Sequence, residues 1–253
     1  MNSIKVRGLE IGIGCPKVCV SITGKTEEEI IESAKQIVDQ QVDLVEWRAD
    51  WFEGLEEEKR VSDLLIRLRE VLQELPLLFT IRTKQEGGES LIPSELYAEI
   101  NQKVAKTRFV DMIDIEVFHE GFNHAELVRD LKKEEMIIVG SNHDFDKTPE
   151  KNEIIRRLCY MQNVECDILK IAVMPKCKND VITLLSATEE MVRLYARKPV
   201  VTMSMGDIGM ISRISGGTFG SSITFGAIGK TSAPGQIEVS RLQSILDTLY
   251  RNM

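Results

Sequence analysis

The sequence lacks the features that mark metal-binding and membrane-spanning proteins. Its 253 residues include three histidines but no His-x-His, His-Glu-x-x-His or Cys/His cluster, so no metal site is expected. No window approaches the roughly 18 apolar residues of a membrane span, and the N-terminus has no apolar stretch behind a basic start. We therefore expect a cytoplasmic protein with no membrane partner.

Clustered positive charge and paired cysteines are also missing. The chain has 32 Lys and Arg against 40 Asp and Glu, and binding to a phosphate backbone relies on clustered cations, so no nucleic-acid partner is expected. The cysteines form no Cys-x-x-Cys pair, and their odd number suits free, mostly structural thiols in a reducing compartment. They are Cys15, Cys19, Cys159, Cys166 and Cys177.

Short apolar runs recur along the chain and predict eight β-strands. The runs are Val18–Ile22, Leu44–Trp47, Leu77–Ile81, Met112–Val117, Met136–Val139, Ile168–Met174, Val200–Met205 and Ile223–Ile228. Most are separated by stretches with helical spacing: Thr26–Gln40, Glu56–Leu75, Ser94–Ala105, His124–Lys133, Glu150–Asn163 and Asp180–Tyr195. The alternation predicts an α/β fold, a single (β/α)8 barrel domain over residues 1–253, although a doubly wound open sheet would give a similar pattern.

The first residues have a pattern of their own. Residues 4–13 alternate around Gly8 and Gly12, which is typical of a β-hairpin. We expect residues 1–15 to form a hairpin that closes one end of the barrel.

Lys170 stands alone in the sixth apolar run. An amine among apolar neighbours loses the solvation of its charged form, and a neutral buried amine is a nucleophile toward carbonyl carbon. The alternative is a lysine at a strand end whose ammonium returns to water.

Other charged residues also lie in or beside predicted strands, where charge is costly unless it is paired or functional. Glu46 and Arg48 project to the same side of the second strand, which suits one shared polar floor; the alternative is a structural ion pair between them. Arg82 ends the third strand, and Glu86 lies in the loop after it.

His143 follows the fifth strand, where a barrel strand opens into its functional loop, whereas His119 and His124 flank Gly121 in a predicted surface turn. Alone, His143 would be a hydrogen-bonded strand-end histidine or a metal ligand. Met203 and Met205 share a face of the seventh strand and are ordinarily core residues. Arg213 lies in the loop that follows.

Together these residues suit carbonyl chemistry on an anionic, hydroxylated substrate, and the chain resembles type I 3-dehydroquinate dehydratases over essentially its whole length. The motifs are Glu46-Trp47-Arg48-Ala49-Asp50, Thr80-Ile81-Arg82-Thr83 with Glu86-Gly87-Gly88, Ser141-Asn142-His143-Asp144-Phe145, Lys170-Ile171-Ala172 and Ser232-Ala233-Pro234-Gly235-Gln236. That family converts 3-dehydroquinate to 3-dehydroshikimate and water in the shikimate route to aromatic amino acids, so the resemblance implies a lyase with a small-molecule substrate and no metal or cofactor.

The resemblance also implies roles for single residues. Lys170 would form an imine with the substrate, and His143 would act as general base and then as general acid. Glu86 would accept a hydrogen bond from His143 and keep the pKa of His143 high enough for both roles. The implied substrate-binding residues are Arg213, Ser232 and Gln236 for the carboxylate, Glu46, Arg48 and Arg82 for ring hydroxyls, Met203 and Met205 as an apolar wall, and Ser21. A homodimer is expected from the family.

Two alternatives stay open. Another Schiff-base barrel, such as a class I aldolase, would share the strand lysine but often binds a phosphate, and Gly226–Thr231 does not have the spacing of a phosphate-binding loop. A catalytically silent metabolite-binding barrel would not need an imine-forming amine.

Overall fold

The curled parallel sheet at the centre of the molecule contains the eight predicted strands. The computed structural model describes residues 3–229 and 233–250. The sheet order is β11-β10-β3-β4-β5-β6-β7-β8-β9. The strands are β3 (Lys17–Ile22), β4 (Leu44–Arg48), β5 (Leu77–Thr80), β6 (Met112–Glu116), β7 (Ile137–Asp144), β8 (Ile168–Val173), β9 (Val200–Ser204), β10 (Ile223–Ala227) and the short β11 (Ile237–Glu238).

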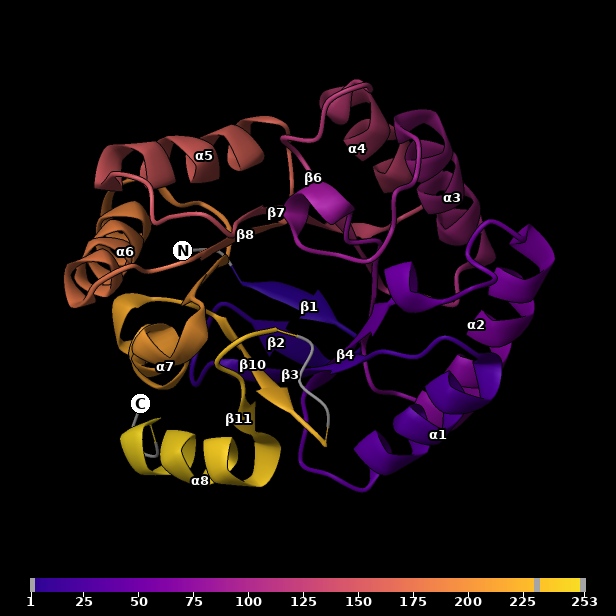
Figure 1. The fold of residues 1–253 in the computed structure, drawn as a ribbon, viewed down its shortest axis with the longest axis horizontal. Coiled ribbons are helices and arrows are strands. Elements are labelled where there is room, and N and C mark those ends of the chain that lie inside the picture. Colours follow the sequence, from indigo (N-terminus) through magenta and orange to yellow (C-terminus); the bar gives the residue numbers. More distant parts are fainter. Residues whose placement is uncertain (1–2, 230–232, 251–253) are drawn as a thin grey trace.

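Helices surround this sheet (Figure 1). They are α1 (Glu27–Val38), α2 (Glu58–Leu72), α3 (Ser94–Thr107), α4 (His124–Lys133), α5 (Lys151–Asn163), α6 (Lys178–Glu190), α7 (Gly206–Ser215) and α8 (Val239–Tyr250). The sheet closes between β9 and β10, where the Ser222 N–H donates to the Val200 carbonyl at 2.8 Å. The predicted α/β barrel class is confirmed.

Most strands of the sheet are buried on both faces because their side chains alternate between two apolar layers. In β8, Leu169, Ile171 and Val173 pack toward the helices, whereas Ile168 and Ala172 belong to a smaller cluster inside the barrel. Lys170 lies between Ile168 and Ala172 in this alternation. The strand therefore points the lysine side chain to the interior of the barrel.

The predicted hairpin is also confirmed. Strands β1 (Ile4–Val6) and β2 (Leu9–Ile11) pair antiparallel through a tight turn at Arg7 and Gly8, both of which have positive φ. The side chains of Val6 and Ile11 are buried in the interior cluster beside residues at the beginnings of the barrel strands, such as Leu44. The hairpin thus closes the end of the barrel at which the strands begin.

Two local predictions were wrong. Strand β7 runs on through His143 to Asp144, five residues beyond the predicted end, because it stays paired with β8 along this length. Arg213, predicted in a loop, lies in the last turn of α7. Among residues 3–229 and 233–250, none of the helices is long and apolar enough to cross a membrane.

Candidate active site

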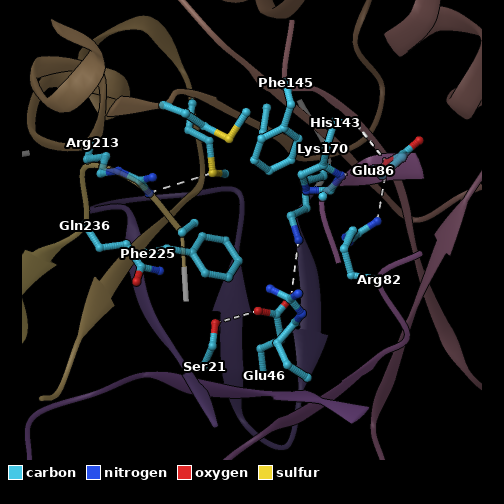
Figure 2. Close-up of a pocket in the computed structure, with 16 residues that line it drawn as sticks. Ser21, Glu46, Arg82, Glu86, His143, Phe145, Lys170, Arg213, Phe225 and Gln236 are labelled. Atoms are coloured by element: carbon cyan, nitrogen blue, oxygen red, sulfur yellow. Dashed lines mark hydrogen bonds and ion pairs between the residues drawn. The ribbon is translucent and has the colours of Figure 1, made fainter. Parts of the chain in front are cut away.

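A cavity lies within the barrel where the carboxyl ends of the strands meet. Eleven of the predicted site residues line it: Ser21, Glu46, Arg48, Arg82, Glu86, His143, Lys170, Met203, Met205, Arg213 and Gln236. Figure 2 shows several of them around the cavity. The remaining predicted residue, Ser232, lies outside the described residues.

The Lys170 amino group is buried between carboxylates. Its Nζ lies 3.1 Å from Oδ2 of Asp114 and 3.4 Å from Oε1 of Glu46. The residue as a whole is 4% exposed. The same nitrogen lies 4.8 Å from the centre of the Phe225 ring. The prediction of apolar surroundings was therefore wrong at the amino group, since two anions and an aromatic face all suit a cation.

Glu46 and Arg48 have separate partners. Glu46 accepts hydrogen bonds from the Ser21 hydroxyl at 2.6 Å and the Thr80 hydroxyl at 3.0 Å, in addition to its contact with Lys170. Arg48 forms two hydrogen bonds of 2.8 Å with the carboxylate of Asp50. This bidentate pair holds the guanidinium in a fixed orientation at the cavity wall.

His143 and Glu86 form a buried pair. Oε2 of Glu86 lies 2.8 Å from Nδ1 of His143 and accepts the backbone N–H of His143 at 2.9 Å, while Oε1 accepts Asn142 Nδ2 at 3.0 Å. Burial raises the pKa of Glu86, as does the neighbouring Glu116 carboxylate. Because N–H donors surround both Glu86 oxygens, we assign the shared proton to Nδ1 of His143, which leaves Nε2 as an acceptor.

The pKa of His143 is held well below its ordinary value. Burial contributes most, and the cations Arg82, Lys170 and Arg48 add to it. The prediction that the pKa of His143 is kept high was therefore wrong. The imidazole is neutral near pH 7, as a general base must be.

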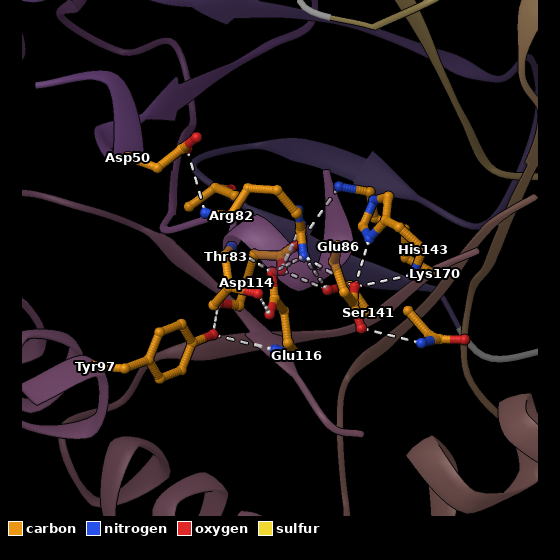
Figure 3. Close-up of polar contacts among 12 residues, drawn as sticks. Asp50, Arg82, Thr83, Glu86, Tyr97, Asp114, Glu116, Ser141, His143 and Lys170 are labelled. Carbon is orange, nitrogen blue, oxygen red and sulfur yellow. Dashed lines mark hydrogen bonds and ion pairs between the residues drawn. The ribbon is translucent and has the colours of Figure 1, made fainter. Parts of the chain in front are cut away.

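Arg82 is the centre of a buried ionic network (Figure 3). Its Nη2 lies 2.8 Å from Oδ1 of Asp114, and its Nη1 lies 2.8 Å from Oε1 of Glu116 and 3.4 Å from Oε2 of Glu86. The Ser141 hydroxyl accepts from Arg82 and donates to Asp114 at 2.5 Å. The guanidinium thus compensates several carboxylates that the barrel interior has desolvated.

Arg213 differs from the other cations of the cavity. It is 2% exposed, and Nη2 donates to the Pro234 carbonyl at 3.0 Å. Among residues 3–229 and 233–250 it forms no ion pair, and its buried Nε has no hydrogen-bond partner. Burial lowers the pKa of Arg213 to about 10. A buried guanidinium with spare donors is suited to a planar anion such as a carboxylate.

The sequence analysis missed several residues of the site and its surroundings. Asp114 and Glu116 alternate in a fully buried strand, so the search for charge within strands would have found both had it included this run. His119, predicted in a surface turn, is 7% exposed, and its Nε2 lies 3.1 Å from the Ser94 hydroxyl. Phe225 was also missed, and Ser141, Asn142 and Phe145 were named only as motif residues without a role.

No group of three or more His, Cys, Asp or Glu side chains with the geometry of a metal site occurs in the part of the chain that the structure describes. The acidic residues around Lys170 are instead paired with cations of the chain. The cavity brings together an amine, a neutral imidazole and a buried guanidinium.

Comparison with known proteins identifies a family over nearly the whole chain. The model of the type I 3-dehydroquinase family matches residues 18–253. The chain is 47% identical over 250 residues, 99% of each chain, to the 3-dehydroquinate dehydratase of Clostridium novyi, and 46% identical over 252 residues to that of Clostridioides difficile, covering 100% and 99% of the two chains.

Solved structures agree with this result. A crystal structure of the Clostridium difficile type I enzyme with covalently modified comenic acid has a TM-score of 0.96 at 45% identity and covers 100% of this chain and 99% of its own. The Geobacillus kaustophilus 3-dehydroquinate dehydratase has the same TM-score at 34% identity, covering 99% and 97%. The chain therefore belongs to the type I 3-dehydroquinase family.

Proposed function

We propose that this protein is a lyase that dehydrates 3-dehydroquinate to 3-dehydroshikimate through an imine on Lys170, in the shikimate route to aromatic amino acids. The observation that carries the proposal is a buried amine in one cavity with a neutral histidine and a guanidinium that has spare donors. Family membership supports the substrate, since the relatives bear the name 3-dehydroquinate dehydratase.

Imine formation is the first step of the proposed reaction. The Lys170 ammonium gives up one proton, and the resulting neutral amine attacks the C3 ketone. A C=N bond replaces the ketone C=O bond, and the oxygen leaves as water with that proton and a second one from the nitrogen. The product is a protonated imine, whose positive charge withdraws electrons from the neighbouring carbon. The C2 proton therefore becomes acidic enough for a neutral imidazole to remove.

Elimination then follows on the same face. His143 accepts the C2 proton at Nε2, because its Nδ1 proton is directed to Glu86. The resulting enamine expels the C1 hydroxyl, and protonated His143 returns its proton to this leaving group so that water departs. Hydrolysis of the product imine regenerates Lys170. Glu86 orients the ring of His143 and stabilises its charged form.

The remaining predicted residues would bind the substrate. Arg213 is the proposed partner of the carboxylate, with Gln236 and Ser232 in the loop beside it. Glu46, Arg48 and Arg82 are proposed to hold the ring hydroxyls. Met203 and Met205 line the cavity next to Arg213 and form its proposed apolar wall.

Borohydride trapping tests the proposal directly, because it reduces a protein–substrate imine to a stable amine. The protein is mixed with 3-dehydroquinate and borohydride, and the modified peptide is identified by mass spectrometry. We expect one ligand-sized adduct, on Lys170. If the folded protein forms no adduct, the result would favour a metabolite-binding barrel without catalysis. An adduct formed only with phosphorylated sugars would favour a class I aldolase.

We further propose that the chain is one folding domain and acts as a cytoplasmic homodimer that needs no cofactor. The cysteines of the described residues are all free, which suits a reducing compartment. Light scattering of the purified protein tests the dimer, and fractionation of the producing cell tests the location. A monomer, or a protein found outside the cytoplasm, would contradict the respective proposal.

A further inference from the structure

Side chains from every second barrel strand surround the Lys170 nitrogen. Glu46 lies on β4, Asp114 on β6, Lys170 on β8 and Phe225 on β10, and each of the other three is in contact with Nζ. A (β/α)8 barrel fills its interior with layers built in this way, four side chains from alternate strands. In this protein the layer contains one cation, two anions and one aromatic ring.

The two anions of this layer are held differently. Glu46 lines the cavity, and the hydroxyls of Ser21 and Thr80 are its neutral partners. Asp114 is fully buried and is not among the cavity-lining residues. Its Oδ1 is held by Arg82 and Ser141, which leaves Oδ2 directed at the lysine nitrogen (Figure 3). A substrate that enters the cavity can form hydrogen bonds with Glu46, whereas the buried Asp114 carboxylate stays beside the Lys170 nitrogen.

We propose that Asp114 is a further catalytic residue, a fixed counter-charge for the Lys170 nitrogen both as an ammonium and as a protonated imine. The inference rests on the proposed imine mechanism.

The charge on the Lys170 nitrogen is the same before and after imine formation, which supports this role. The lysine ammonium and the ketone give a protonated imine and water. The nitrogen gives up two protons, which leave with the ketone oxygen, and a C=N double bond replaces the C=O double bond. The nitrogen therefore carries one positive charge before and after the step. A carboxylate 3.1 Å away compensates that charge in both states without moving.

The electrostatics of Asp114 agree with a permanent anion. Burial by itself would raise the pKa of the Asp114 carboxyl, but Arg82 and Lys170, with the Ser141 hydroxyl, lower it below its ordinary value. Arg82 thus keeps Asp114 ionised through Oδ1, the carboxylate oxygen that does not contact Lys170. Asp114 is therefore not expected to exchange protons with the substrate.

Glu116 provides a matched control. It lies on the same strand as Asp114, is equally buried, and its Oε1 is also 2.8 Å from an Arg82 nitrogen, but its other contacts go to Thr83. No contact between Glu116 and Lys170 occurs in the described residues. Asp114→Asn and Glu116→Gln each remove one anion from Arg82, and only the first removes one from Lys170.

The experiment compares borohydride trapping with 3-dehydroquinate across a pH series in the wild type and both variants. For Asp114→Asn we expect the upper pH limit of trapping to fall by about one unit or more, a tenfold change in proton affinity, and turnover at neutral pH to fall at least tenfold. Glu116→Gln should keep a pH limit close to the wild type. Equal shifts in both variants would mean that Asp114 acts only through Arg82, and would overturn the proposal.

Circular dichroism establishes that each variant is folded. If Asp114→Asn does not fold, Asp114→Glu and Glu116→Asp replace the pair, because both keep the negative charge near Arg82 and move the carboxylate. Trapping should then fall severalfold more in Asp114→Glu, and equal trapping would overturn the proposal. A wild type that forms no adduct would contradict the imine mechanism itself, whereas a wild-type adduct with an unchanged Asp114→Asn profile would contradict only this inference.

Discussion

At the scale of single residues, we expect the protonation state of His143, the proposed general base, to set the pH range in which the site is active. Its pKa is lowered, so the base form persists at a pH where an ordinary histidine, with a pKa of about 6.5, would be protonated. We expect the acid limb of kcat/KM to have its midpoint below this value, since activity is lost only where His143 takes up a proton. A pH–rate profile at low substrate concentration measures it, and a midpoint above 7 would contradict the assignment.

Replacing the same residue separates the chemical steps. His143→Ala should still form the Lys170 imine but turn over at least a hundredfold more slowly, because general acid–base catalysis contributes about 10²–10⁴-fold. Trapping and steady-state assays on one sample measure both effects. Full turnover would remove His143 from the mechanism, and loss of trapping in folded protein would show that the imidazole is also needed to form the imine.

At the scale of elements, helix α7 places Arg213 at the cavity. Gly209 in this helix lies so close to β9 that an added Cβ would be 2.3 Å from the Ser204 carbonyl oxygen. Gly209→Ala must therefore push α7 away from the sheet. This movement displaces Arg213, which lies one helical turn after Gly209. We expect KM for 3-dehydroquinate to rise about tenfold, since a charged hydrogen bond is worth roughly 1.5–3 kcal/mol.

Ile211 on the exposed side of the same helix supplies the control. It is 51% exposed, so Ile211→Ala should leave KM within about twofold of the wild type. Steady-state kinetics on both variants, with their melting temperatures, measure the difference. An unchanged KM in folded Gly209→Ala would show that the position of α7 does not control substrate binding.

The elements also show what the sequence could and could not predict. Apolar runs predicted all strands of the described parallel sheet except the two-residue β11, because burial on both faces leaves little freedom of composition. The end of β7 was missed, because its last residues are polar and are kept in the strand by pairing with β8. The partners of Lys170 could not be read from one strand, because Asp114 is 56 residues away and meets it only when the barrel brings β6 and β8 to one layer.

At the scale of the whole molecule, the two ends of the barrel have separate tasks. The hairpin fills the end where the strands begin with Val6 and Ile11, whereas the cavity with Lys170 opens at the other end. At the hairpin end the side chains need the right volume to fill the barrel, whereas at the cavity end the charged groups need the right positions. Stability and chemistry should therefore respond to different substitutions.

Ile11→Ala tests this separation. Ile11 is fully buried, so its truncation should lower the free energy of unfolding by about 2–5 kcal/mol, whereas Ile13→Ala, at a position 51% exposed, should change it by less than about 0.5 kcal/mol. Urea unfolding measures both, and a single transition would support the one-domain proposal. Below the transition, the fraction of Lys170 trapped by borohydride should match the wild type. A trapped fraction that falls in folded Ile11→Ala would mean that packing at the closed end also shapes the cavity.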